Sequence, residues 1–339
     1  MMQTVELRPG YVISRVIKGG WHLAGGHGEV AHAQAMADMA AYVAAGITTF
    51  DCADIYTGVE SLIGDWLRDA PAADRTRVRV HTKFVPDLDI LPRIDRAQVA
   101  RIIDRSRTRL GRERLDLVQF HWWDYDIPRW LDTALWLREL QREGAIELLG
   151  GTNFDTAHVA ALLAAGIDLA TMQVQFSLLD DRPLRGLATL GPKLLCYGTV
   201  AGGFLSDRWL GQPEPAGPLA NRSLTKYKLI IDDAGGWDWF QALLRTLAAV
   251  GRRHGADIAA VASRCVLEFP AVAAVIIGVA RGAHLASHAA LCDLRLDATD
   301  HAAIDAVLAQ RRPLEGDVYA LERDRTGRHG RIMHYNLGN

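Results

Sequence analysis

Residues 46 to 64 read Gly46-Ile-Thr-Thr-Phe-Asp51-Cys-Ala-Asp-Ile-Tyr56-Thr-Gly-Val-Glu60-Ser-Leu-Ile-Gly64. A glycine ends a helix, and the apolar run that follows it is typical of a short buried strand. Asp51 stands at the end of that strand, and Tyr56 lies in the loop beyond it. From Val59 onward the apolar residues recur at helical spacing. A carboxylate and a phenol thus lie between a strand end and a helix, where the catalytic groups of a βα-barrel collect.

Short apolar strands and amphipathic helices alternate along nearly the whole chain, which indicates parallel βα units. An N-terminal hairpin is expected to turn at Arg8-Pro9-Gly10. The barrel strands are then expected at Val12–Lys18, Ile47–Asp51, Val78–Lys83, Leu117–Phe120, Ile146–Gly150, Met172–Gln175, Leu194–Tyr197 and Val275–Gly278. This is the number of strands that closes a barrel. The sequence therefore predicts an α/β fold, a single (β/α)8 TIM barrel domain over residues 1–339.

Two segments interrupt this alternation. Residues 198–236 are rich in Pro, Gly and Trp, and residues 311–339 form a tail. Long loops in compact domains are usually functional lids or disordered segments, so we expect a lid-like loop and a C-terminal tail here. Among the regular helices, one is expected to begin at the capping residue Asp95 and to stop at Gly111.

Composition excludes several classes of function. The 339 residues are 49% hydrophobic with a formal net charge of −2, so nothing favours nucleic acid or an anionic membrane as a partner. The four cysteines form no Cys-x-x-Cys pair, which suits reduced thiols. The N-terminus lacks the apolar core of a signal peptide, and the longest apolar run is shorter than the roughly 20 residues that span a bilayer. We expect a cytoplasmic protein and leave its oligomeric state open.

Four polar residues fall on the same predicted rim, namely Asp51, Tyr56, Lys83 and His121. A lysine in an apolar context must find a carboxylate or lose its charge, and Asp51 is the natural partner. A tyrosine beside that ammonium would lose its proton more easily than its reference pKa of about 10 implies. Such a tyrosine can give a proton to an oxygen, or remove one, near neutral pH. The alternative is that Asp51 and Lys83 form a purely structural ion pair.

At these residues the chain resembles the aldo-keto reductase superfamily. The family pattern Gly-x-x-x-Phe-Asp-x-Ala-x-x-Tyr-x-x-x-Glu-x-x-x-Gly is matched by Gly46, Phe50, Asp51, Ala53, Tyr56, Glu60 and Gly64. The resemblance implies hydride transfer between a nicotinamide and a carbonyl or alcohol carbon of an aldehyde, ketone or sugar. It makes Tyr56 the general acid, with Lys83 lowering its pKa and Asp51 holding that lysine. It also implies that His121 hydrogen-bonds the carbonyl oxygen.

The resemblance further implies a nicotinamide site. Thr152 and Asn153 match an element that holds the carboxamide, Gln173 matches a contact to the same amide, and Tyr197 matches the aromatic that stacks on the ring. After this tyrosine the chain departs from the Ser-Pro-Leu of relatives, so backbone N–H groups are expected to bind the pyrophosphate. The remaining residues assigned to this part of the cofactor are Gly20, Trp21, Gly198, Thr199, Gly203 and Leu205.

The last strand resembles the start of the family's adenosine-phosphate loop, where the amides and dipole of a helix N-terminus favour anions. Arg281 and His284 are the candidates for a 2′-phosphate, and His288 stands where relatives place an asparagine near the adenine. Gly278 and Val279 are the other residues assigned to this part of the cofactor site. NADP(H) is therefore favoured as the cofactor, with NAD(H) as the alternative.

Three tryptophans are assigned to the substrate site for a small carbonyl or sugar. Trp21 resembles the family's active-site tryptophan, and one of Trp122 and Trp123 is expected to pack into the barrel wall while the other lines the substrate mouth. The histidines at positions 22, 27 and 32 have equal spacing that matches no recognised ligand geometry, so no metal is expected.

Two other functions remain open at this level. One is an NAD(P)-dependent aldose or sugar dehydrogenase that runs in the oxidative direction and uses the same four residues. The other is a weakly catalytic, NADPH-binding regulatory subunit, as in the potassium-channel β-subunits that share the superfamily. Turnover of simple aldehydes discriminates the enzyme from the regulatory subunit.

Overall fold

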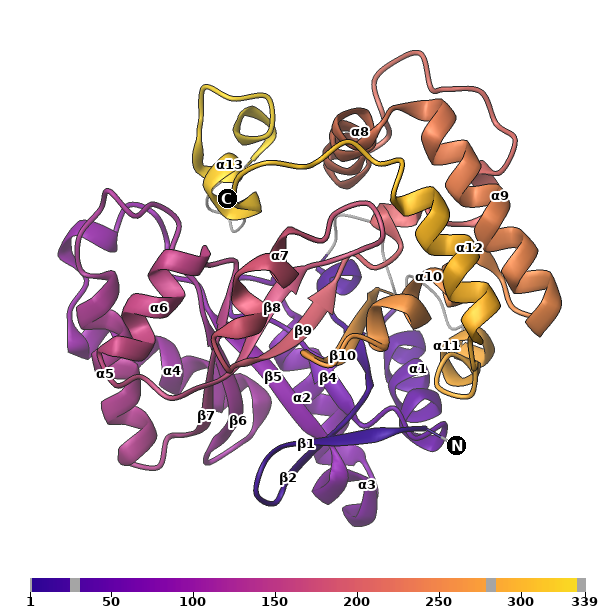
Figure 1. The fold of residues 1–339 in the computed structure, drawn as a ribbon. Helices are drawn as coiled ribbons and strands as arrows, with labels where there is room; N and C mark the ends of the chain where they lie inside the picture. The colour runs from indigo at the N-terminus through magenta and orange to yellow at the C-terminus, as the bar shows by residue number, and fades with distance from the viewer. Residues whose placement is uncertain (1, 25–30, 279–284, 334–339) are drawn as a thin grey trace.

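The computed structural model describes residues 2–24, 31–278 and 285–333. Its centre is a closed barrel of parallel strands in the order β10-β3-β4-β5-β6-β7-β8-β9. These strands are β3 (Val16–Gly19), β4 (Thr49–Asp51), β5 (Arg79–Phe84), β6 (Leu115–Phe120), β7 (Ile146–Thr152), β8 (Leu169–Gln175), β9 (Lys193–Tyr197) and β10 (Val272–Gly278). Figure 1 shows helices surrounding this barrel. The predicted (β/α)8 fold is confirmed.

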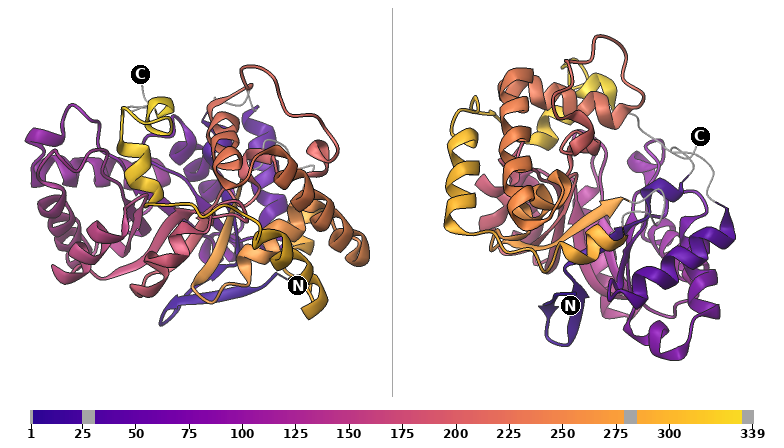
Figure 2. Two further views of the ribbon diagram at one scale, coloured as in Figure 1. Left: turned by 45° about the horizontal axis from the view of Figure 1, so that its top comes forward. Right: turned by 90° about the vertical axis from the view of Figure 1, so that its right-hand side faces the viewer.

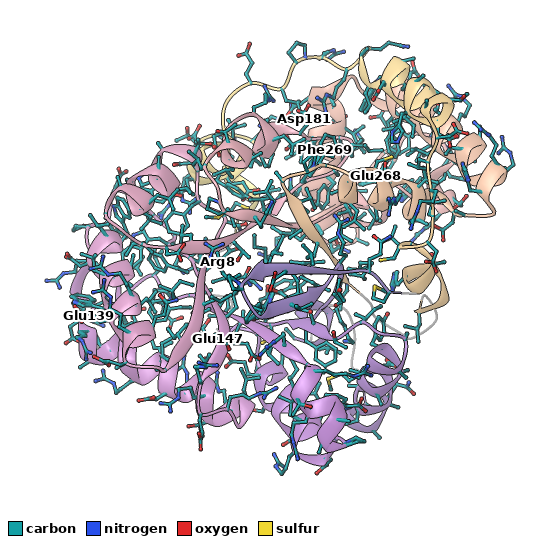
Figure 3. All side chains as sticks on the ribbon, turned by 60° about the horizontal axis from the view of Figure 1, so that its bottom comes forward. Arg8, Glu139, Glu147, Asp181, Glu268 and Phe269 are labelled. Atoms are coloured by element: carbon teal, nitrogen blue, oxygen red, sulfur yellow. The ribbon has the colours of Figure 1, made fainter. Side chains whose placement is uncertain are left out.

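An antiparallel hairpin of β1 (Thr4–Arg8) and β2 (Tyr11–Ser14) lies at the end of the barrel where the strands begin. Arg8 ties it to the barrel, because its guanidinium lies 2.7 Å from the Asp168 carboxylate and 3.2 Å from the Leu169 carbonyl oxygen (Figure 3). The single strand predicted over 12–18 is in fact two strands. Residues before Arg15 pair with β1, whereas those after it pair with β10 and β4.

Helices surround the barrel on its outside (Figure 1). They are α1 (His32–Ala44), α2 (Val59–Asp69), α3 (Ala72–Arg77), α4 (Arg96–Leu110), α5 (Trp130–Arg142), α6 (Thr156–Ala164), α7 (Arg182–Arg185), α9 (Trp237–His254), α10 (Ile258–Leu267), α11 (Leu285–Ala290) and α12 (Ala298–Leu308). The helix α4 has the predicted ends. Asp95 forms a capping box with Gln98, and Gly111 adopts a left-handed conformation with φ 62°.

The segment 198–236 is not the long loop that its composition suggested. Its second half forms α8 (Arg222–Ala234), which Asn221 caps by accepting a hydrogen bond from the Leu224 amide at 2.9 Å. Its first half contains the short 3-10 turns η4 (Ala201–Gly203) and η5 (Asp207–Trp209). Apolar side chains of both halves pack with α9 in a second hydrophobic cluster. The prediction missed this helix because the Pro- and Gly-rich stretch before it hid its periodicity.

The tail is described as far as residue 333, and it is folded. It contains the helix α13 (Val318–Arg323) and the 3-10 turn η7 (Gly330–Ile332). The views in Figures 1 and 2 place α13 over the end of the barrel opposite the hairpin. Tyr319 fixes it there, because its hydroxyl accepts a hydrogen bond of 2.7 Å from the amide of Gln175, the last residue of β8. No helix in the described residues is long and apolar enough to cross a membrane.

Candidate active site

The neighbouring strands β4 and β5 bring Asp51 and Lys83 together. Lys83 Nζ lies 2.7 Å from Asp51 Oδ2 and 2.8 Å from the carbonyl oxygen of Cys52. Each of the two charged side chains is only 6% exposed. Burial by itself lowers the pKa of Lys83, but the Asp51 carboxylate and Tyr56 together raise this pKa above its ordinary value. The predicted ion pair is present, and its lysine is charged.

Tyr56 lies next to this charged lysine. Lys83 Nζ is 4.9 Å from the centre of the Tyr56 ring, and the ring of Trp21 meets Tyr56 edge-on at 5.0 Å. Burial raises the pKa of Tyr56 above its ordinary value, whereas Lys83 lowers it, and burial prevails. Lys83 thus acts on this pKa in the expected direction, but burial keeps the pKa of Tyr56 above its ordinary value. Tyr56 is in the protonated form that a general acid requires.

Two glutamines that point into the barrel hold the other oxygen of Asp51. Gln119 Nε2 and Gln173 Nε2 donate to Asp51 Oδ1 at 3.0 Å and 2.6 Å. Gln173 Nε2 also lies 3.0 Å from Gln119 Oε1. Gln173 was expected to contact the nicotinamide amide, whereas its NH2 group here supports the Asp51 carboxylate. Gln119 was not among the predicted site residues. The sequence feature that could have identified it is its polar side chain within the buried strand β6.

His121 follows β6 and is a buried neighbour of β7. Its Nδ1 lies 3.1 Å from the carbonyl oxygen of Thr152. Burial lowers the pKa of His121 most, Arg323 and Lys83 also lower it, and the hydrogen bond to Thr152 raises it; together these effects lower the pKa to about 3. The imidazole is therefore neutral at ordinary pH.

This arrangement determines which nitrogen of His121 carries the proton. A carbonyl oxygen only accepts hydrogen bonds, so the Nδ1 atom that contacts Thr152 must be the protonated one. In a neutral ring, Nε2 then carries a lone pair and acts as an acceptor. The expected hydrogen bond from His121 to a substrate carbonyl oxygen would require a proton on Nε2. The neutral ring is instead suited to accept a hydrogen bond from a hydroxyl group.

The residues expected around the nicotinamide lie beside these four groups. Tyr197, at the end of β9, donates a hydrogen bond of 3.0 Å from its hydroxyl to Asn153 Oδ1. Asn153 has a positive φ of 57°, which turns the chain directly after β7. The Thr152 side chain is buried. A half-buried aromatic ring locked to an amide at a strand end is a surface that fits the flat ring and carboxamide of a nicotinamide.

Gly20 lies very close to the backbone of Asp51. Its amide donates to the Asp51 carbonyl oxygen at 2.7 Å, and an added Cβ would lie 2.7 Å from the same oxygen. Only glycine therefore fits here. The structure brings Gly20 and Trp21 to Asp51 and Tyr56, as the sequence-based assignment requires of neighbours in one site.

The backbone after Tyr197 is less available for a phosphate than expected. The amides of Gly203 and Leu205 both donate to the Val200 carbonyl oxygen, at 2.9 Å and 3.1 Å. The hydroxyl of Thr199 lies 2.9 Å from that of Ser263. Gly198 has a positive φ of 74°, and a Cβ on it would lie 2.0 Å from the hydroxyl oxygen of Tyr227. The assignment of a pyrophosphate to the amides of Gly203 and Leu205 is thus not supported by this arrangement.

Of the residues assigned to the adenosine end of the cofactor, Val279, Arg281 and His284 lie outside the described residues. Gly278 is exposed at the end of β10. His288 on α11 places Nδ1 3.1 Å from the hydroxyl of Tyr42.

The sequence and the fold of this chain have counterparts in known proteins. The model of the aldo/keto reductase family matches residues 15–309. The chain belongs to this family. As an aldo/keto reductase it is an NAD(P)H-dependent oxidoreductase whose family acts on small carbonyl compounds.

Individual aldo/keto reductases and their relatives resemble the chain over most of its length. Protein tas of Escherichia coli is 29% identical over 321 residues, which cover 82% of this chain and 89% of that protein. The 6-dehydroglucose reductase of Agrobacterium fabrum is 27% identical over 293 residues, with coverages of 82% and 88%. The structure of a glycerol dehydrogenase from Gluconobacter oxydans has the same fold, with a TM-score of 0.77, 21% identity and coverages of 92% and 97%.

The two adjacent tryptophans of this reductase have different environments. Trp122 is fully buried, and its Nε1 donates to the Ile127 carbonyl oxygen at 3.1 Å. Trp123 is 9% exposed, and its ring lies edge-on to His121 at 4.6 Å. The assignment of Trp122 to the substrate site is therefore corrected, because this ring belongs to the core. Trp123 and the 37% exposed Trp21 keep positions beside the catalytic candidates.

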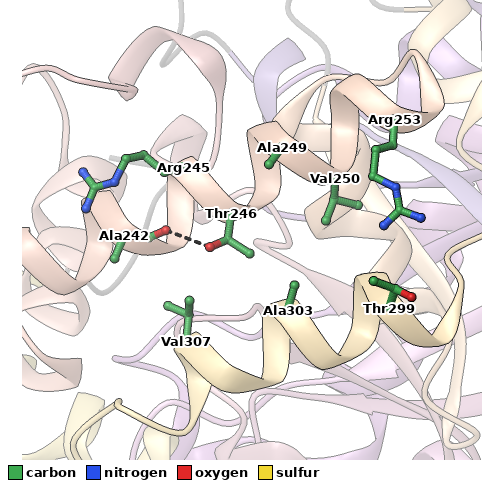
Figure 4. A pocket seen from close by; sticks show the side chains of 9 residues that line it. All are labelled: Ala242, Arg245, Thr246, Ala249, Val250, Arg253, Thr299, Ala303 and Val307. Carbon is green, nitrogen blue, oxygen red and sulfur yellow. Dashed lines mark hydrogen bonds between the residues drawn. The ribbon is translucent and has the colours of Figure 1, made fainter.

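Residues 2–24, 31–278 and 285–333 contain no group of three His, Cys, Asp or Glu side chains arranged to hold a metal. All four cysteines are free and buried, and burial raises their pKa values. A surface groove between α9 and α12, drawn in Figure 4, is lined by none of the assigned residues.

Proposed function

We propose that the protein reduces a carbonyl compound with hydride from NADPH, and that Tyr56 is the general acid. The observation that carries this proposal is the position of Lys83, which bonds Asp51 at 2.7 Å and lies 4.9 Å from the ring centre of Tyr56. A charged ammonium beside a protonated phenol stabilises the phenolate that forms as the proton leaves. Asp51 keeps the lysine charged and in place.

The cofactor, when bound, supplies the hydride. The chain's own residues would orient it, with the Tyr197 ring providing a flat face and Asn153 providing hydrogen-bonding groups beside it. The preference for NADPH over NADH rests on Arg281 and His284, which follow β10 in the sequence. A 2′-phosphate beside a guanidinium gains a charge-assisted hydrogen bond that a 2′-hydroxyl lacks.

The substrate proposed is a carbonyl compound with a hydroxyl group next to the carbonyl, as in sugars. His121 supports this choice, because its unprotonated Nε2 is an acceptor and a neighbouring hydroxyl is the donor that satisfies it. A relative named 6-dehydroglucose reductase supports it independently. In this scheme Tyr56 alone donates to the carbonyl oxygen, while His121 orients the neighbouring hydroxyl.

The test is a spectrophotometric assay of NADPH and NADH oxidation with a panel of aldehydes, hydroxyaldehydes and aldoses. The Tyr56→Phe variant should lose turnover by about 100-fold or more and keep its affinity for NADPH. Unchanged turnover in this variant would contradict the acid assignment. Faster reaction of oxidised cofactor with aldoses would favour the sugar dehydrogenase, and tight NADPH binding without turnover would favour the regulatory subunit.

A further inference from the structure

Arg323, the last residue of α13, reaches from the tail into two loops of the site. Its Nη1 donates to the Asn153 carbonyl oxygen at 3.0 Å, and its Nη2 donates to the Trp122 carbonyl oxygen at 2.5 Å. Trp122 directly follows His121, and Asn153 directly follows Thr152. The guanidinium therefore bridges the same two loops that the His121–Thr152 hydrogen bond joins, one residue further along each of them.

An aromatic platform restricts where this guanidinium can go. Its central carbon lies 4.1 Å from the ring centre of Tyr125, within the range of a cation–π contact. The Tyr125 ring in turn stacks on the ring of His158, with the two ring centroids 3.5 Å apart and an interplanar angle of 10°. The Tyr125 hydroxyl accepts a hydrogen bond from the Asp155 amide at 3.1 Å. Arg323 thus rests on a ring that is itself fixed to the start of α6.

The rest of α13 is anchored to the nicotinamide side of the site. The Tyr319 hydroxyl is hydrogen-bonded to Tyr197. Glu322 forms a buried ion pair of 2.5 Å with Lys226 of α8, and Lys226 Nζ lies 5.8 Å from the centre of the Tyr197 ring. One short helix of the tail therefore contacts both the aromatic ring proposed for the cofactor and the loops that carry His121 and Asn153.

We propose that Arg323 is a positioning residue of the active site, because its forked guanidinium sets the separation of the His121 loop and the Asn153 loop. The planar fork presents two parallel donors to two carbonyl oxygens, which a lysine ammonium cannot match. The proposal rests on the proposed function of these loops, and it assigns to the C-terminal tail a role in arranging the reacting groups.

The charge of Arg323 has a second effect on His121. Two cations face this imidazole, Arg323 from α13 and Lys83 from β5, and both disfavour its protonation. The Thr152 carbonyl on β7 acts in the opposite sense. Removing the Arg323 charge should therefore raise the pKa of His121, whereas removing an arginine that only docks the tail should not.

The experiment compares Arg323→Met and Arg323→Lys with the parent enzyme. It measures the NADPH dissociation constant by fluorescence titration, kcat and KM for the best substrate, and the His121 pKa by NMR of labelled histidine. For Arg323→Met we expect kcat to fall by about tenfold or more, NADPH binding to weaken, and the His121 pKa to rise. Arg323→Lys should keep the His121 pKa near that of the parent and still lower kcat.

The matched control is Arg325→Met, two residues further along the same tail. Arg325 forms an ion pair of 3.1 Å with Asp124 in the loop that follows β6, and its side chain is 54% exposed. This variant should leave all three measurements unchanged. Equal losses in Arg323→Met and Arg325→Met, or an unchanged kcat, dissociation constant and His121 pKa in a folded Arg323→Met, would overturn the proposal.

Failure of the Arg323 proposal can be distinguished from failure of the proposed function. The NADPH titration and the histidine NMR require no turnover, so they test Arg323 even if the Tyr56 assignment fails. If Arg323→Met does not fold, Arg323→Lys carries the test, because a kcat equal to that of the parent would show that the two-carbonyl bridge is dispensable.

Discussion

Gln173 Nε2 lies 2.6 Å from Asp51 Oδ1, although β8 and β4 stand on opposite sides of the barrel in the strand order. Gln119 of β6 adds a second donor to the same oxygen at 3.0 Å. The Asp51 carboxylate thus accepts hydrogen bonds from three other strands, through Lys83 of β5, Gln119 of β6 and Gln173 of β8. Its position is a property of the barrel interior and does not depend on a surface loop.

Replacing Asp51 by asparagine leaves the Lys83 ammonium buried without its counter-charge. Breaking a buried pair in this way costs about 3–5 kcal/mol, so the free energy of unfolding should fall by that order in urea titrations. Turnover should fall as well, because the lysine then loses its proton more easily. Asp65→Asn is the control, since the Asp65–Arg68 pair is at the surface and its removal should change neither quantity appreciably. A fully active and fully stable Asp51→Asn would show that the pair is dispensable.

The two glutamines can be separated by their effects on the cofactor. Gln119→Met and Gln173→Met each remove one donor to Asp51 and should each reduce the free energy of unfolding by about 1–3 kcal/mol. If Gln173 also contacts the nicotinamide carboxamide, as sequence analysis predicted, only Gln173→Met should raise the NADPH dissociation constant. Equal dissociation constants in the two variants would limit Gln173 to the support of Asp51. Isothermal titration with NADPH and chemical denaturation provide the two measurements.

The strand pattern and the strand-end polar residues could be predicted because both are local in the sequence. Asp51 and Tyr56 are five residues apart, and Lys83 ends the short segment Val78–Lys83 that was predicted as a strand. Gln119 and Arg323 were not predictable in this way. The partners of Gln119 come from strands that are distant in the sequence. Arg323 donates to backbone carbonyl oxygens, and every residue has one, so the sequence does not indicate which ones it binds. The protonated nitrogen of His121 was likewise missed, because it depends on the contact with Thr152.

His121 should favour substrates that carry a hydroxyl group beside the carbonyl. The parent enzyme should therefore reduce glyceraldehyde with a higher kcat/KM than propanal, and His121→Leu should bring the two values together. Because the pKa of His121 is lowered to about 3, its titration should be absent from the pH profile of kcat/KM between about pH 5 and 9. A histidine step near neutral pH, or an unchanged substrate ratio in His121→Leu, would contradict the acceptor role. Trp123→Phe, which keeps an aromatic ring beside His121, is the control for local packing.

His81 should make the fold sensitive to acid. Its ring is fully buried on β5, and neither ring nitrogen has a hydrogen-bond partner among the residues that the structure describes. Burial lowers its pKa from 6.5 to about 4. Between these two values the unfolded chain binds a proton at this position and the folded chain does not, so stability is lost as the pH falls through that window.

The size of this loss follows from the width of the window. A shift of one pKa unit corresponds to about 1.4 kcal/mol, so His81 should contribute a loss of roughly 3 kcal/mol between neutral pH and pH 4. In His81→Leu the free energy of unfolding should decrease less over the same range, as measured by urea titrations at several pH values. His32→Gln, at a position with a side chain that is 62% exposed, should retain the pH dependence of the parent. If His81→Leu and the parent lose stability equally on acidification, the buried ring is not the acid-sensitive group, and protonation of His121 becomes the next candidate to test because its pKa is also lowered by burial.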